Sequence, residues 1–170
     1  MSFSKVKSYA KINLALNVTG KLKKLHKIES IVSFINLHDL IFISRTKDKN
    51  HKISFYGKFS KSIRKNNTVK KLFEILDDNK LLRNKKFKVK IKKNIPQRAG
   101  LGGGSMNAAN ILNFLIKKKF VKINKKKLYK ISSLIGSDVI LGINSQCTIL
   151  KSNNDIKKFS NCPKFYTLLI

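Results

Sequence analysis

The chain is poor in several residue types whose abundance would define other classes of protein. It has two cysteines, two prolines, no tryptophan and only eight acidic residues in a length of 170. Cys147 and Cys162 are too far apart for the C-x-x-C spacing of a zinc or redox motif, so we expect two unpaired thiols. No apolar run is long enough to cross a bilayer, and the N-terminus lacks the apolar core of a secretory signal. The sequence therefore predicts a cytoplasmic protein that contacts no membrane.

The scarcity of acidic residues leaves a large excess of positive charge. Lysine and arginine together number 38, which gives a formal net charge of +30. Such an excess attracts phosphate-bearing partners, and it makes a basic RNA-binding module an alternative interpretation. However, only four of the basic residues are arginine, the lysines are spread along the chain, and neither zinc-finger spacing nor an RNA-recognition motif occurs. We therefore interpret the lysines as solvated surface and do not expect nucleic-acid binding.

Hydrophobic periodicity predicts an α+β domain with helices packed on one side of a sheet. Residues 6–18 alternate as a strand that Thr19 and Gly20 then turn. Leu37 to Asp39 are expected to join the strands on either side of them. Asn67 is placed to cap the first helix and Gly136 to end the last. Further strands are predicted over residues 30–36, 40–45, 52–56, 86–92, 146–150 and 165–170, and helices over residues 68–78, 105–118 and 125–135.

The last five residues, Tyr166 to Ile170, form an apolar run with no turn or polar tail after it. Domains do not usually end in the middle of a strand, so we expect the chain to be a fragment. We assign residues 1–160 to one N-terminal domain and residues 161–170 to the first strand of a second, incomplete domain.

A glycine-rich segment, Gly100-Leu101-Gly102-Gly103-Gly104-Ser105, lies between the predicted strand 86–92 and the helix that follows. Glycines allow close backbone approach, and consecutive N–H groups at a helix N-terminus attract anions. No Gly-Lys-Ser/Thr follows, so the segment is not a Walker A loop. The acidic residue of the Rossmann fingerprint is also missing. We predict a phosphate-binding loop of another nucleotide-binding class.

Four segments resemble one superfamily of small-molecule kinases. Residues 96–105, PQRAGLGGGS, resemble the P-x-x-x-G-L-G-[GS]-[GS]-S loop of the galactokinase, homoserine kinase, mevalonate kinase and phosphomevalonate kinase superfamily. Residues 8–20, SYAKINLALNVTG, resemble the opening strand of its 4-diphosphocytidyl-2-C-methyl-D-erythritol kinase family. Residues 136–139, GSDV, and His26 resemble that family's Gly-Ala-Asp-Val and Gly-Tyr-His elements. The four matches occur in the family's order and cover nearly the whole chain.

The resemblance implies the superfamily's N-terminal domain, which has a mixed sheet and is related to domain 2 of ribosomal protein S5. It also implies transfer of the γ-phosphoryl group of ATP to the 2-hydroxyl of 4-diphosphocytidyl-2-C-methyl-D-erythritol, a step in isoprenoid precursor synthesis. Asp138 would be the general base, with Lys11 beside it stabilising the developing alkoxide. Asn13 and His26 would bind the substrate, and Ser105 would contact phosphate or Mg²⁺. The residues implied for ATP binding are Asn67, Lys93, Pro96, Gln97, Arg98, Ala99, Gly100, Leu101, Gly102, Gly103, Gly104, Ser105 and Met106.

The sequence departs from the family pattern at several of these positions. The family's loop is richer in glycine before Leu101, where this chain has Gln97, Arg98 and Ala99. Arg98 either adds a phosphate contact or crowds the site. Leu25 replaces the aromatic residue expected before His26, which bears on the substrate more than on kinase activity. A sister kinase acting on mevalonate or homoserine therefore remains an alternative, and the sequence gives no oligomeric state.

Overall fold

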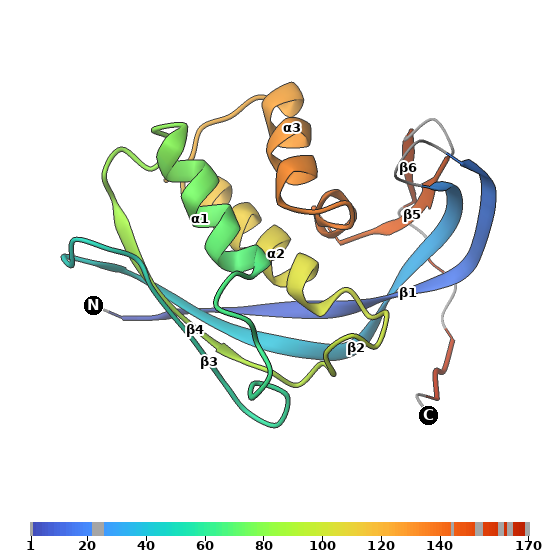
Figure 1. The fold of residues 1–170 in the computed structure, drawn as a ribbon, viewed down its shortest axis with the longest axis horizontal. Coiled ribbons are helices and arrows are strands. Elements are labelled where there is room, and N and C mark those ends of the chain that lie inside the picture. Colours follow the sequence, from blue (N-terminus) through green and yellow to red (C-terminus); the bar gives the residue numbers. More distant parts are fainter. Residues whose placement is uncertain are drawn as a thin grey trace.

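The computed structural model describes residues 2–21, 26–143, 145–151, 155–159, 162 and 165–168. Within these residues a six-stranded mixed sheet forms around β2 (His26–Thr46). β1 (Ser4–Lys21) pairs antiparallel with β2 along nearly its whole length. The other edge of β2 pairs with β4 (Lys86–Lys92) at one end and with β5 (Cys147–Leu150) at the other. β3 (Lys52–Tyr56) lies parallel to β4, and β6 (Ile156–Phe159) lies antiparallel to β5 (Figure 1).

β2 is one strand where the sequence predicted two. The join expected at Leu37 to Asp39 is wrong, because the strand continues through it with a register shift. Tyr9 pairs with His38 and Ala10 pairs with Ile35, so Asn36 and Leu37 have no partner on β1. A bulge of this kind bends a strand without ending it. The turn expected at Thr19 and Gly20 is also wrong, since Gly20 still pairs with Lys27.

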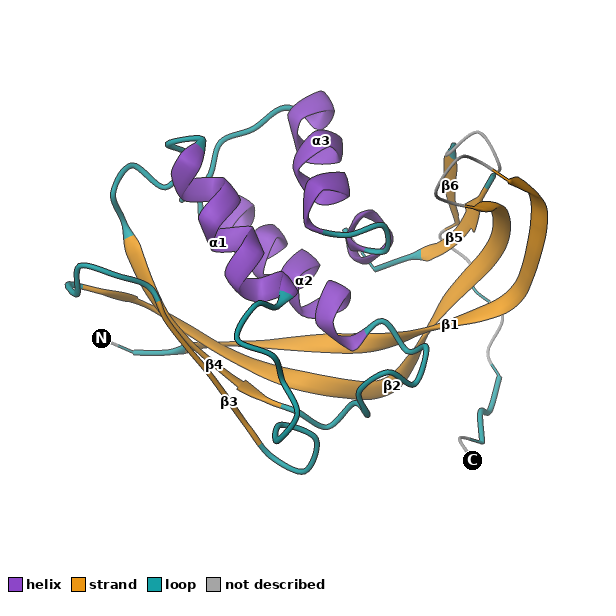
Figure 2. Cartoon of the chain, in the orientation of Figure 1, coloured by secondary structure: helices purple, strands orange, loops and turns teal. Residues whose placement is uncertain are grey.

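The helices cover one face of the sheet, as predicted (Figure 2). They are α1 (Thr68–Asp78), α2 (Gly103–Lys117) and α3 (Lys125–Ile135), and a short 3₁₀ helix, η1 (Val139–Gly142), follows α3. Asn67 caps α1, because its side-chain oxygen accepts the backbone N–H groups of Val69 and Lys70. α2 begins at Gly103 and not at Ser105, so two of the glycines belong to the first helical turn.

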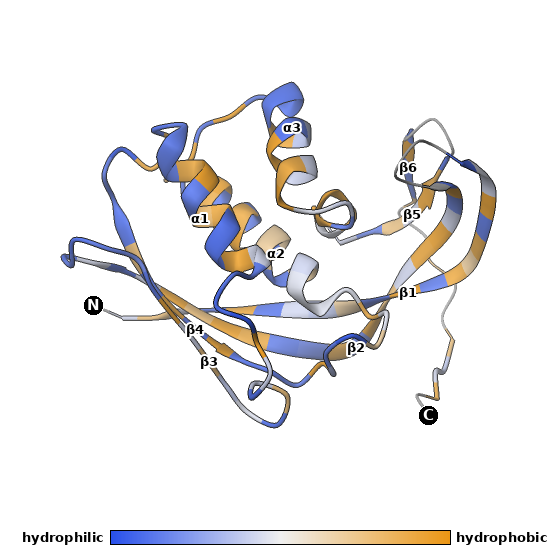
Figure 3. Ribbon diagram, in the orientation of Figure 1, coloured by the Kyte–Doolittle hydropathy of each residue, from blue (hydrophilic) through white to orange (hydrophobic). Residues whose placement is uncertain are grey.

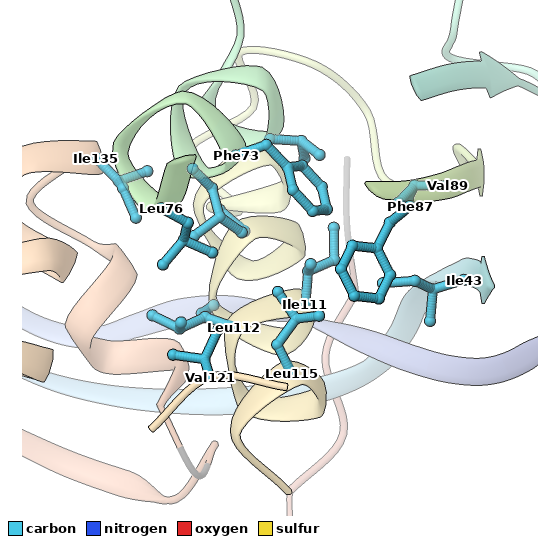
Figure 4. Close-up of a cluster of buried hydrophobic side chains, with 14 of the residues drawn as sticks. Ile43, Phe73, Leu76, Phe87, Val89, Ile111, Leu112, Leu115, Val121 and Ile135 are labelled. Atoms are coloured by element: carbon cyan, nitrogen blue, oxygen red, sulfur yellow. The ribbon is translucent and has the colours of Figure 1, made fainter. Parts of the chain in front are cut away.

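The core lies between these helices and the sheet. Hydrophilic and hydrophobic residues alternate along the strands and recur along α1, so each element has one apolar face (Figure 3). Phe73 and Leu76 of α1 and Ile111 and Leu112 of α2 meet Phe87 of β4 in one buried cluster (Figure 4). Burial of this cluster holds α2, and with it the glycine segment, firmly on the sheet.

The C-terminal segment differs from two expectations. Residues 165–168 form no strand and pair with none of the described strands, and residues 169–170 lie outside the described residues. The assignment of residues 161–170 to a second domain stays a prediction. Cys147 and Cys162 are joined in a disulfide, with their α-carbons 5.8 Å apart, so the expectation of two unpaired thiols is wrong. Along the described residues, no helix is both long and apolar enough to span a membrane.

Candidate active site

Lys11 and Asp138 are distant in sequence and meet in the structure. The ammonium of Lys11, on β1, lies 3.6 Å from a carboxylate oxygen of Asp138, the residue just before η1. It also donates a hydrogen bond of 2.6 Å to the side-chain oxygen of Asn13. The Lys11 side chain is 9% exposed and that of Asp138 is 36% exposed, so the pair lies at the surface with the carboxylate facing outward. A carboxylate held beside a cation and open to solvent can accept a proton from a substrate hydroxyl.

The side chain of Asn13 is held in place by Ser30 of β2. Its amide nitrogen donates to the hydroxyl of Ser30 at 2.6 Å, and that hydroxyl donates to the backbone oxygen of Ala15 at 2.7 Å. This chain of hydrogen bonds leaves the orientation of the Asn13 amide defined, with its oxygen toward Lys11. The family resemblance implied that Asn13 binds substrate. It gave no indication of Ser30, because a serine in a β-strand is an ordinary feature of a sequence.

The glycine segment packs directly on Lys11. The backbone N–H of Lys11 donates to the carbonyl of Leu101 at 3.0 Å. Gly102 follows with a φ of 65°, and a Cβ at this position would lie 2.8 Å from Cγ of Lys11. A side chain on residue 102 would therefore be disfavoured both by the left-handed backbone and by overlap with Lys11. Glycine at this position allows the glycine segment and Lys11 to pack against each other.

The first turn of α2 offers unoccupied backbone donors to an anion. Gly102 precedes the helix and has no side chain with which to cap it, so the N-terminal N–H groups are left without a side-chain acceptor. The hydroxyl of Ser105 lies in the same turn, 3.7 Å from where a Cβ of Gly136 would be. The glycine segment, Ser105 and the turn that carries Asp138 are therefore neighbours, as a phosphoryl-transfer site requires.

A buried carboxylate that the sequence did not single out holds the segment before the glycines. Asp39 is fully buried and forms an ion pair with Lys93. It also accepts the backbone N–H groups of Asn94 and Ile95, at 2.7 and 2.9 Å, and the side-chain amide of Asn107 at 3.0 Å. The available signal was one acid within residues 30–44, which contain no other Asp, Glu, Lys or Arg in a very basic chain. The ammonium of Lys93, which the family resemblance implied for ATP binding, is thus engaged by Asp39.

A cavity of about 390 Å³ adjoins the glycine segment. Its lining includes five of the residues implied for ATP binding: Asn67, Lys93, Gln97, Arg98 and Gly104. Thr68 and Asn107, which the sequence did not indicate, line it as well, and the Thr68 hydroxyl donates to the carbonyl of Gly104 at 2.7 Å. The amide nitrogen of Asn107 donates to Asp39, and its side-chain oxygen is buried with no hydrogen-bond partner among the described residues.

Several predicted residues contribute less directly. The Asn67 side chain is used by the cap of α1 and by hydrogen bonds to the carbonyls of Arg64 and Lys65. The Met106 side chain is buried against Val32 and Leu141 and points into the core. Leu101 packs in a second small cluster with Ala10 and Ile95. Pro96 is half-buried and Ala99 is exposed in the segment that leads to the glycines, and the side chain of His26 lies outside what the structure describes.

The comparisons with known proteins define the class. Residues 67–149 match the family model of the GHMP kinases N terminal domain, a span that includes the glycine segment and Asp138. The chain belongs to the GHMP kinases and carries the N-terminal domain of that family.

Relatives that are similar over most of the chain include two enzymes of one name. The chain is 62% identical, over 169 residues, to a 4-diphosphocytidyl-2-C-methyl-D-erythritol kinase of Pelagibacter ubique (strain HTCC1062), covering 99% of this chain and 60% of the relative. It is 36% identical to the enzyme of the same name from Petrotoga mobilis, covering 91% of this chain and 58% of the relative. A crystal structure of 4-(cytidine 5'-diphospho)-2C-methyl-D-erythritol kinase superimposes with a TM-score of 0.71 at 21% identity, covering 92% of this chain and 55% of that one. The chain thus spans about 60% of the length of its relatives.

Proposed function

We propose that the whole protein phosphorylates the 2-hydroxyl of 4-diphosphocytidyl-2-C-methyl-D-erythritol with ATP, in isoprenoid precursor synthesis. The observation that carries this proposal is the Lys11–Asp138 pair, 3.6 Å apart, set against Gly102 of a phosphate-binding segment. The 62% identity to a relative of that name supports the choice of substrate. The cytoplasm would be its place of action, and a small molecule rather than a nucleic acid its partner.

Each residue of the site has a separate role in phosphoryl transfer. Asp138 accepts the proton of the attacking hydroxyl, and Lys11 stabilises the negative charge that develops on that oxygen. Asn13 orients the ammonium of Lys11 through their 2.6 Å hydrogen bond. The N–H groups at the start of α2 hold the phosphates, and the cavity lined by Asn67, Thr68 and Asn107 receives the base.

Magnesium would be held mainly by the nucleotide. No group of three or more His, Cys, Asp or Glu side chains in the described part of the chain could hold a metal ion. Mg²⁺ in kinases commonly takes one or two protein ligands, with phosphates and water supplying the rest. The hydroxyl of Ser105, in the first turn of α2, fits such a role. When bound, the ion would neutralise phosphate charge during transfer.

The test is ADP release by the purified protein, both as this chain and with the further length that its relatives have. ATP and Mg²⁺ are supplied with one of three acceptors: the diphosphocytidyl compound, mevalonate or homoserine. We expect turnover with the first acceptor alone. Turnover with mevalonate or homoserine would assign the protein to a sister kinase, and silence of the longer protein with all three would contradict the proposal.

A further inference from the structure

The side chains that line the cavity beside the glycine segment carry positive charge and no negative charge. Three cationic side chains line it, those of Arg64, Lys93 and Arg98, and no acidic residue does. Lys93 is neutralised by its buried ion pair with Asp39. Arg64 and Arg98 are exposed, and no ion pair between described residues involves either of them. Two guanidinium groups therefore border the cavity without a counter-charge.

The choice of arginine at these two positions departs from the composition of the chain. Only four of its 38 basic residues are arginine, and two of those four line this one cavity. Lysine serves nearly everywhere else as the solvated cation. A guanidinium differs from an ammonium in presenting a planar fork of donors that matches two oxygens of a phosphate. The position of the arginines thus indicates a phosphate ligand rather than general solubility.

The backbone of Arg98 adopts an energetically unfavourable conformation. Its φ is 59°, in the left-handed region that favours glycine. The family loop that the sequence resembles is richer in glycine at this point. The neighbouring side chain of Gln97 donates a 2.6 Å hydrogen bond to the carbonyl of Phe59, which joins the glycine segment to the segment that carries Arg64. Backbone strain of this kind clusters at active sites and ligand clamps.

We propose that Arg98 and Arg64, which both line the cavity that receives the base, form a guanidinium clamp for the polyphosphate of the same nucleotide. The inference rests on the proposed function, since it names the part of the nucleotide that these two residues bind. The clamp adds charge-assisted hydrogen bonds to those of the α2 N-terminus.

The test is calorimetric titration of the full chain with ATP, AMP and inorganic tripolyphosphate, alongside thermal melting. Arg98→Gly relieves the backbone strain, so its melting temperature should equal or exceed that of the wild type. Its dissociation constants for ATP and tripolyphosphate should rise by about 10- to 100-fold, the loss expected for one charged hydrogen bond, with little change for AMP. Arg98→Lys should bind at an intermediate strength, because it keeps the charge and loses the fork.

Two matched controls isolate the clamp. Arg83 is exposed, has a φ of 48° and does not line the cavity, so Arg83→Gly relieves the same strain and should leave ATP binding unchanged. Arg64→Met should weaken ATP binding, whereas Arg45→Met on β2 should not. Wild-type affinity for ATP and tripolyphosphate in Arg98→Gly would overturn the inference while leaving the kinase proposal intact. Tripolyphosphate binding that depends on Arg98 without any ATP binding would support the clamp and contradict the nucleotide function, and a wild type that binds neither would overturn both.

Discussion

Gly102 lies against Lys11 so closely that a Cβ at residue 102 would come within 2.8 Å of the lysine's Cγ. The segment proposed to hold phosphate and the side chain proposed to stabilise the reacting oxygen are therefore in direct contact. The backbone hydrogen bond from Lys11 to Leu101, at 3.0 Å, fixes the same approach. Positioning of this kind dominates phosphoryl transfer, because there is little covalent chemistry for the protein to perform.

Replacing Gly102 by alanine should displace Lys11. Gly100 is a matched control, since its φ is 72° and a Cβ there would meet nothing within 4 Å. Gly100→Ala should lose about 1 kcal/mol of stability from the backbone alone. Gly102→Ala should lose more, and its kcat should fall by about 100-fold relative to Gly100→Ala, as expected for a misplaced catalytic group. Urea unfolding and ADP release measure the two effects, and equal behaviour of the two variants would contradict the proposed contact.

Asp39 should be essential to the stability of the domain. Asp39→Asn leaves the Lys93 ammonium buried without a counter-charge and should cost about 3–5 kcal/mol in the free energy of unfolding. Asp39→Asn combined with Lys93→Met should recover part of that loss, because the stranded charge is gone. The control is Asp48→Asn, which removes an exposed pair with Lys52 at 3.0 Å and should change little. A single Asp39 variant as stable as the Asp48 variant would refute the role of the network.

His51 should make stability depend on pH. Its Nδ1 accepts the backbone N–H of Phe87 at 3.1 Å, so the neutral ring donates from Nε2 to Asp77 at 3.2 Å. Burial lowers the pKa of His51 below its ordinary 6.5, and the nearby Lys86 lowers it further, although Asp77 opposes the shift. Below pH 6.5 the unfolded chain then binds more protons than the folded one, so this stability is complete above that pH and is lost as the pH falls.

The measurement for His51 is the urea midpoint between pH 8 and pH 5 for the wild type and for His51→Phe. The wild type should lose stability over the acidic half of that range, and the variant should show a flatter profile. Parallel profiles for the two proteins would assign the pH dependence to another group.

Much of the fold was predictable because its elements carry local signals. The strict alternation of residues 86–92 and the helical spacing of residues 68–78 gave β4 and α1 with the bounds that the structure shows. Asn67 was identified as a cap from its chemistry and position alone. Lys11 and Asp138 came from the family resemblance, and the structure brings them together.

The features that could not be predicted from the sequence depend on contacts between residues that are distant in the chain. The bulge in β2 is defined by its pairing with β1, so a polar interruption at His38 and Asp39 looked like a loop. The role of Asp39 requires donors from residues 93–95 and 107, which meet only in the folded chain. The disulfide between Cys147 and Cys162 likewise follows from the spatial approach of the C-terminal segment to β5.

The central claim is that Asp138 is the general base of a kinase site. The most direct test compares turnover and ATP affinity for Asp138→Asn and for Asp78→Asn, an exposed acid at the end of α1, in the longer protein with the diphosphocytidyl substrate. The account predicts that Asp138→Asn loses about 10²- to 10⁴-fold in kcat with its ATP dissociation constant unchanged, while Asp78→Asn behaves as the wild type. Full turnover by Asp138→Asn would contradict the account.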